Sequence, residues 1–152
     1  LLAFNESTVS WNGDGTLFSS NSANTSGGAI YAEGDATVSW DGDGTQFGSN
    51  SAGVGGGAIY AYSSTVSWDG DDTLFSSNSA DDSGGAILAF NGSTASWDGD
   101  GTLFISNSAR KIGGGAIYSG ESSTVFWYGE STQFSSNFAG DGGGAIIAVQ
   151  WT

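Results

Sequence analysis

Short stretches of this chain alternate apolar and polar residues, and clusters of Gly, Asp and Ser separate them. In Thr37–Trp40, for example, Val38 and Trp40 are two positions apart, with Thr and Ser between and before them. An apolar spacing of two, instead of 3.6, predicts β-strands, and the flanking Gly-rich and Asp-rich clusters predict turns. We therefore expect three short strands in the second unit of the chain, at Thr37–Trp40, Thr45–Phe47 and Ala58–Ala61.

This unit recurs five times, with tryptophans spaced 29, 28, 29 and 30 residues apart. Three strands and three turns in such a unit correspond to one coil of a parallel β-helix. A coil cannot bury its own apolar face, whereas stacked coils can. The repeat predicts an all-β protein, with residues 1–152 forming one β-solenoid domain of five coils that rises roughly 24 Å.

Stacking in register predicts that like residues form ladders along the axis. We expect the Phe and Ile ladders to fill the core, the Trp column to share the inward side of its strand with Val, and the Asn column to occupy an inward turn where stacked amides hydrogen-bond. The expected ladders are Trp11, Trp40, Trp68, Trp97 and Trp127; Phe18, Phe47, Phe75, Phe104 and Phe134; Asn21, Asn50, Asn78, Asn107 and Asn137; and Ile30, Ile59, Ile87, Ile117 and Ile146.

Two short motifs carry a resemblance to a known family. Phe18-Ser19-Ser20-Asn21 is followed by Gly27-Gly28-Ala29-Ile30, and the same F-x-x-N and G-G-A-I quartets recur in the four later units. This pairing resembles the repeat of chlamydial polymorphic outer-membrane proteins and of related bacterial and algal surface proteins. The resemblance implies a right-handed parallel β-helix that is exposed at the cell surface and acts in adhesion or as surface structure.

Composition and charge exclude several functions. The chain has 2 Lys and Arg against 16 Asp and Glu, a formal net charge of −14, and no His or Cys. Such a chain lacks the basic residues that bind nucleic acids or anionic membranes. It also lacks the usual zinc, haem and iron–sulfur ligands and a His-activated nucleophile. The carboxylates belong to the repeat itself and no insertion forms a cleft, so we predict no enzyme and no membrane span.

Three surface features suggest further chemistry. The Asp-Gly-rich turn resembles half of a calcium loop, and stacking would bring its like charges together, so calcium is the one possible metal; the alternative is a solvated turn. A column of outward Thr and Ser residues, from Thr8 and Ser10 onward, is typical of ice-binding solenoids. Three N-x-S/T sequons would accept glycans in a eukaryotic host. The candidates are Asp14, Asp43, Asp71 and Asp100 for calcium, and Asn5, Asn24 and Asn91 for glycans.

The ends lead to the functional hypothesis. The chain starts and stops within the same strand of the repeat, and neither end offers a polar cap, which indicates either a segment of a longer solenoid or a protomer that stacks head-to-tail. We predict a non-catalytic, extracellular or cell-surface structural rod whose main partner is another copy of itself. The alternative is an adhesin-like module that contacts surface glycans or a host surface, and ice binding is the third possibility.

Overall fold

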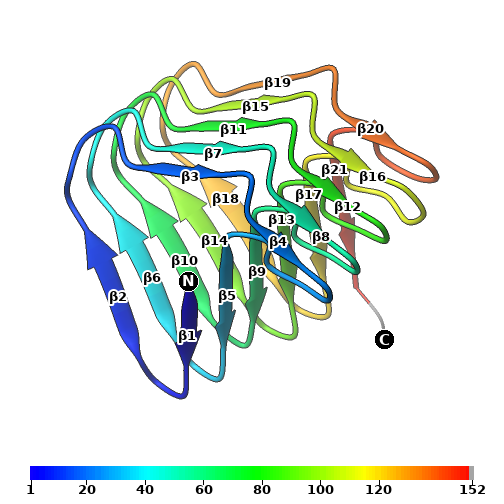
Figure 1. The fold of residues 1–152 in the computed structure, drawn as a ribbon, viewed down its shortest axis with the longest axis horizontal. Coiled ribbons are helices and arrows are strands. Elements are labelled where there is room, and N and C mark those ends of the chain that lie inside the picture. The colour runs from blue at the N-terminus through cyan, green and yellow to red at the C-terminus, as the bar shows by residue number, and fades with distance from the viewer. Residues whose placement is uncertain (151–152) are drawn as a thin grey trace.

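The computed structural model describes residues 1–150, which form strands and turns with no helix in that range. The chain winds through successive coils, and each coil adds one strand to each of four parallel sheets (Figure 1). The coils turn clockwise as they recede from the N-terminal coil, which is the right-handed sense (Figure 1). The fold is therefore an all-β parallel β-solenoid, as the repeat predicts.

We call the four sheets A to D in the order in which the chain enters them. Sheet A contains β1 (Leu2–Phe4), β5 (Ile30–Glu33), β9 (Ile59–Tyr62), β13 (Ile87–Phe90), β17 (Ile117–Gly120) and β21 (Ile146–Val149). Sheet B contains β2 (Thr8–Trp11), β6 (Thr37–Trp40), β10 (Thr65–Trp68), β14 (Thr94–Trp97) and β18 (Thr124–Trp127). Sheet C contains β3 (Leu17–Ser19), β7 (Gln46–Gly48), β11 (Leu74–Ser76), β15 (Leu103–Ile105) and β19 (Gln133–Ser135). Sheet D contains β4 (Ser22–Ala23), β8 (Ser51–Ala52), β12 (Ser79–Ala80), β16 (Ser108–Ala109) and β20 (Phe138–Ala139).

The structure adds a fourth strand to the three expected in each coil. This strand of sheet D follows the ladder Asn of each unit and has only two residues, which is too short for an alternation of apolar and polar residues to show. Two expected strands lie one residue later than predicted: the Thr45–Phe47 strand is β7, Gln46–Gly48, and the Ala58–Ala61 strand is β9, Ile59–Tyr62. Each sheet D strand is followed by a loop that leads back to sheet A.

The register places like residues on like residues. Thr65, Val66, Ser67 and Trp68 of β10 pair with Thr37, Val38, Ser39 and Trp40 of β6, position by position. Along each strand of sheet B the inner coils alternate half-buried Thr and Ser with buried Val or Ala and Trp. Because successive side chains of a strand point to opposite faces, the apolar set faces the interior and the hydroxyl set faces outward.

Aromatic ladders form the centre of the core. Successive Trp rings stack with centroid separations of 4.7–5.0 Å and are 4–8° from parallel. Successive Phe rings stack at 4.7–4.8 Å, within 2–5° of parallel. These separations match the distance between neighbouring strands of a sheet, so the backbone hydrogen bonds and the ring stacks share one repeat.

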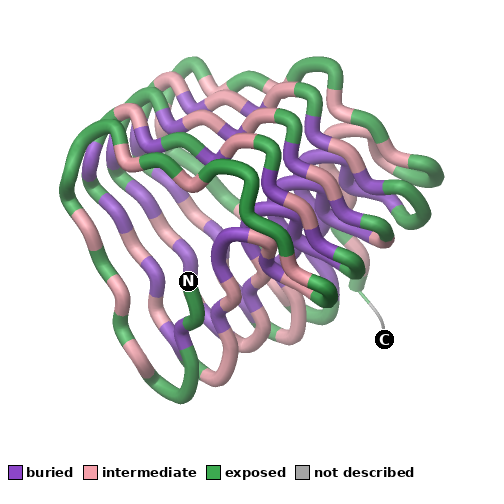
Figure 2. Tube along the Cα trace, in the orientation of Figure 1, coloured by how far each residue is buried: buried purple, intermediate pink, exposed green. Residues whose placement is uncertain are grey.

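The inner coils are better buried than the two end coils (Figure 2). Trp40, Trp68 and Trp97 are at most 1% exposed, whereas Trp127 in the last coil is 40% exposed. Sheet A has six strands and the other sheets have five, because the described chain contains both β1 and β21.

Candidate functional site

The asparagine column forms a continuous amide ladder at the corner between sheets C and D. In the middle of the stack, Asn50 donates its backbone N–H and its side-chain Nδ2 to Oδ1 of Asn78, both at 3.0 Å. The same Nδ2 donates to the carbonyl oxygen of Phe18 in the preceding coil at 3.0 Å. Asn78 and Asn107 repeat this arrangement, and all three residues are fully buried. Each inner amide therefore joins three consecutive coils.

The tryptophan column has polar partners that the sequence did not reveal. The indole Nε1–H of Trp40 donates to Oγ1 of Thr73 at 3.3 Å, and Trp68 and Trp97 donate to the corresponding threonines of the next coil, Thr102 and Thr132. Each of these bonds again links one coil to the next. Trp11 is the exception, because its buried Nε1 has no hydrogen-bond partner. The last residue of the D-G-D-G-T turn is thus a core residue.

We expect Thr73→Val to lower the free energy of unfolding more than Thr45→Val does. Both substitutions remove a hydroxyl that donates to a turn carbonyl, from Gly70 and Gly42 respectively. Only Thr73→Val also takes the acceptor from a buried indole, that of Trp40. The expected difference is about 1 kcal/mol, the usual contribution of one hydrogen bond. Urea unfolding of the two variants measures it, and equal losses would contradict the coil-to-coil role of the indole bond.

The carboxylates predicted to bind calcium lie on one exposed corner, between sheets B and C. Each accepts a hydrogen bond from the backbone of the next coil: the N–H of Asp43 donates to Asp14 at 3.1 Å and the N–H of Asp71 donates to Asp43 at 2.9 Å. Asp71 and Asp100 accept from the following coil in the same way. Among residues 1–150, no group of three or more Asp, Glu, His or Cys is placed to hold a metal ion. The backbone bonds give this column a structural role whether or not calcium binds.

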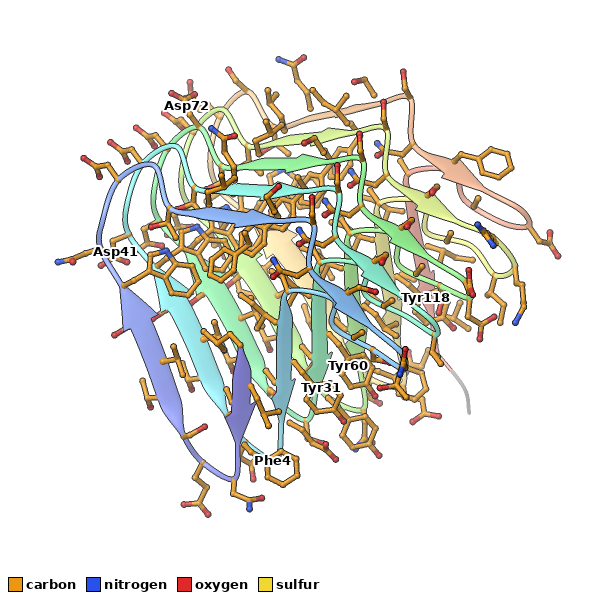
Figure 3. The ribbon with its side chains drawn as sticks, in the orientation of Figure 1. Phe4, Tyr31, Asp41, Tyr60, Asp72 and Tyr118 are labelled. Atoms are coloured by element: carbon orange, nitrogen blue, oxygen red, sulfur yellow. The ribbon has the colours of Figure 1, made fainter. Side chains whose placement is uncertain are left out.

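A second acidic column runs beside the first. Asp41, Asp69 and Asp98 occupy equivalent positions in the three middle coils, at the corner where Figure 3 labels Asp41. Partial loss of solvent raises the pKa of Asp69, and the charges of Asp98 and Asp41 on either side raise it further. Asn12 and Tyr128 take this position in the end coils, so the column of like charges is short.

We expect Asp69→Asn to stabilise the fold at neutral pH. A carboxyl whose folded pKa lies above its unfolded pKa binds protons more tightly when folded, so its ionisation lowers stability as the pH rises from the unfolded to the folded value. Asp69 is exposed, so the gain at pH 7 is about 0.5 kcal/mol, and it vanishes below the ordinary Asp pKa. Urea unfolding at pH 7 and at a pH below the ordinary Asp pKa tests this. Asp35→Asn, at another corner, is the control. An equal pH-dependent gain in the control would show general charge repulsion instead.

The remaining predicted surface residues lie on three different sides. The Thr and Ser column faces outward on sheet B, and Phe126 interrupts it in the last coil, where this side chain is 38% exposed. Asn5 and Asn24 are exposed, whereas Asn91 is half-buried and donates to Oγ of Ser63 at 2.7 Å. The structure therefore brings neither the sequons nor the hydroxyl column together with the carboxylates.

Sequence analysis missed an aromatic surface on the outside of sheet A. In β9, Ile59 and Ala61 are buried in the core, and the alternating Tyr60 and Tyr62 face outward. Along the stack Tyr31 and Tyr60 lie with ring centroids 4.9 Å apart, and Figure 3 shows Phe4, Tyr31, Tyr60 and Tyr118 following one another along this side. The sequence did contain a signal for this surface. The residue after each Ile of the G-G-A-I motif is apolar or aromatic, although an outward strand position is normally polar.

Comparison with known proteins identifies the repeat. The sequence pattern of the Chlamydia polymorphic membrane protein repeat matches the chain four times, at residues 15–33, 44–62, 72–89 and 101–120. Each match spans the sheet C and sheet D strands and extends into the following strand of sheet A. No curated protein and no solved structure matches the chain. Within residues 1–150 no helix is long and apolar enough to cross a membrane.

Proposed function

Because the chain belongs to the Chlamydia polymorphic membrane protein repeat family, whose repeat is that of surface-exposed outer-membrane-type proteins, we propose that it acts as a non-catalytic structural rod at the cell surface. The observation that carries this proposal is the continuity of the ladders. Amide, indole and backbone bonds all run from coil to coil, so the stack resists bending without any ligand. The Asn and Asp side chains, which could otherwise serve catalysis, instead hydrogen-bond one coil to the next.

We further propose that rods associate head-to-tail. Within the described residues, the core side chains of the two end coils are only half-buried. They are Val125, Phe134 and Ile146 in the last coil and Val9, Trp11 and Phe18 in the first. The ladders are also complementary at the two ends. Oδ1 of Asn21 accepts no bond within the described chain, and the backbone N–H of Asn137 donates none there. Stacking would give each of these groups the partner that the inner coils have.

One strand must move for this stacking to be flush. Sheet A has one strand more than the other sheets, so β21 of one copy would occupy the position of β1 on the next copy. β1 is the weaker occupant: it pairs with β5 over three residues, and its Leu2 and Phe4 side chains are 69% and 46% exposed. β21 pairs over four residues with β17. We propose that β21 displaces β1 of the neighbouring copy.

Electron microscopy and sedimentation of the chain test this arrangement. Filaments with an axial repeat of roughly 24 Å, five coils at the strand spacing, would support it. Ala148→Pro in β21 is expected to abolish them, because proline on an edge strand blocks pairing. Ala148→Ser is the matched control, since Ser119 occupies the equivalent position in β17. Short isolated rods from the unmodified chain would reject stacking and favour the adhesin-like alternative.

Thermal unfolding with and without calcium, alongside the same microscopy, tests the proposal that Asp14, Asp43, Asp71 and Asp100 bind calcium. We expect calcium to raise the melting temperature if the column binds it, because an ion that binds only the folded state stabilises that state. A chelator would then lower the melting temperature and shorten the filaments. No change with calcium or with chelator would leave the column with its backbone bonds alone.

A further inference from the structure

The outer face of sheet A forms the floor of an apolar groove. Its outward side chains include Tyr60, Leu88, Phe90 and Tyr118, which come from three successive coils. Tyr60 and Phe90 are half-buried and open to the groove, whereas Leu88 and Tyr118 are each only 6% exposed. An outward strand face of a solvated sheet is normally polar, as the Thr and Ser face of sheet B is. Gly120 keeps this floor flat, because a Cβ there would lie 2.8 Å from the Tyr118 ring and 3.0 Å from the Phe90 ring.

The loops between sheets D and A form the wall of the groove. Val54 and Ile112 lie on two loops of this wall, on either side of the loop that carries Asp82, and are 44% and 48% exposed. The backbone of one loop packs against the floor, since a Cβ on Gly55 would overlap the Leu88 side chain. The groove between wall and floor has a volume of about 440 Å³ and extends along the axis over several coils.

Acidic groups surround this apolar floor. Asp82 on the wall and Glu121 beside the floor line the groove, and Glu33 accepts a 2.6 Å hydrogen bond from the hydroxyl of Tyr31 on the same face. Burial, and then the Glu33 charge, raise the pKa of Tyr60 above the usual tyrosine value. One of the two basic residues of the chain, Arg110, pairs with Asp81 at 3.3 Å. The groove is therefore aromatic and negatively charged.

We propose that this groove binds an extended, positively charged segment of a partner protein. Lys and Arg side chains match both parts of the site: their aliphatic stems cover apolar surface and their cationic groups stack on aromatic rings or pair with carboxylates. The chain's net charge of −14 steers such a segment toward it. A second copy fits poorly, because two identical faces would bring Asp82 and Glu121 of both copies together.

A synthetic peptide of alternating lysine and leucine residues, carrying a fluorescent label, serves as the probe. We expect it to bind the unmodified chain, with an affinity that falls as salt is added. Asp82→Asn with Glu121→Gln keeps the shape of the groove and removes its two charges, and we expect about tenfold weaker binding. Asp41→Asn with Asp98→Asn makes the same change in net charge on a different corner. This control should change the affinity less than about twofold.

The floor is tested separately with Tyr60→Thr combined with Phe90→Thr. Both residues are on strands, face outward and are half-buried, so threonine keeps the strand propensity while removing the rings. We expect about tenfold weaker binding and unchanged salt dependence. Thermal unfolding of each variant verifies the fold before binding is measured.

Several results would overturn the proposal. Equal losses in the groove variant and its charge-matched control would show non-specific attraction. Binding of a neutral oligosaccharide or of a second copy, with no binding of the cationic peptide, would assign the groove to another occupant. The groove lies on the side of the rod, so the titration works equally on isolated rods. Failure of stacking and failure of this proposal are therefore distinguishable.

Discussion

Asn78→Ala is expected to lower the free energy of unfolding by about 4 kcal/mol. The substitution removes the Oδ1 that accepts from both the backbone N–H and the Nδ2 of Asn50, and the Nδ2 that donates to the Phe47 carbonyl oxygen. Asn50 and Asn78 are fully buried, so water cannot replace these bonds. A buried polar group without a partner costs about 1–3 kcal/mol, and here the backbone N–H of Asn50 and the carbonyl of Phe47 are both affected. Urea unfolding followed by tryptophan fluorescence measures the loss.

Asn21→Ala is the matched control in the first coil. Asn21 is exposed and its side chain donates a single ladder bond, to Oδ1 of Asn50. Its loss should cost less than about 1 kcal/mol. Asn78→Asp supplies a second test, because the carboxylate accepts from Asn50 but cannot donate to Phe47 while it is ionised. This variant should recover part of its stability on acidification, and equal costs for Asn21→Ala and Asn78→Ala would contradict the ladder.

The strands and core were predictable because their signal is repeated five times. A single T-V-S-W segment is an ordinary strand pattern, whereas its recurrence with an in-register Trp, Phe and Ile predicts parallel stacking. The polar corners were less predictable. The residue before each ladder Asn has a left-handed backbone, with φ near +55° at Ser20, Ser49, Ser77, Ser106 and Ser136. Sequence reasoning expects Gly or Asn at such angles, so nothing in these serines marks the corner.

The surface chemistry was harder to predict for a different reason. Asp14 and Asp43 have the residue type and spacing of cation ligands, but the sequence does not show that a backbone N–H of the next coil already bonds each carboxylate. The aromatic groove depends on which way Tyr60 and Leu88 point and on a loop that returns over them. Both features arise from the stacking of coils, so they cannot be predicted from one repeat unit considered alone.

Gly57→Ala is expected to be strongly destabilising for so small a substitution, with a loss of about 4 kcal/mol or more. Gly57 is the second glycine of its G-G-A-I motif, at the corner where the chain enters sheet A. A Cβ there would overlap the carbonyl oxygen of Gly85 in the next coil and lie 2.5 Å from the carbonyl oxygen of Ser79. Both obstacles are backbone atoms, so no side chain can rotate away. The coils would have to separate locally and lose ladder bonds. Thermal or urea unfolding measures the loss.

Two glycines provide the controls for this effect. Gly144 occupies the same column in the last described coil, and a Cβ there meets only the Asn137 carbonyl oxygen at 3.1 Å within the described structure. Gly144→Ala should therefore cost far less than Gly57→Ala. Gly48 lies in β7 with Oγ of Ser76 at 3.7 Å, an ordinary contact, so Gly48→Ala should be neutral or stabilise by up to about 1 kcal/mol. Equal losses at Gly57 and Gly144 would mean that the cost arises within one coil. A larger loss at Gly57 than at Gly144, which we expect, would mean that the cost arises in the contact between coils. The proposed stacking of whole rods depends on the same kind of contact.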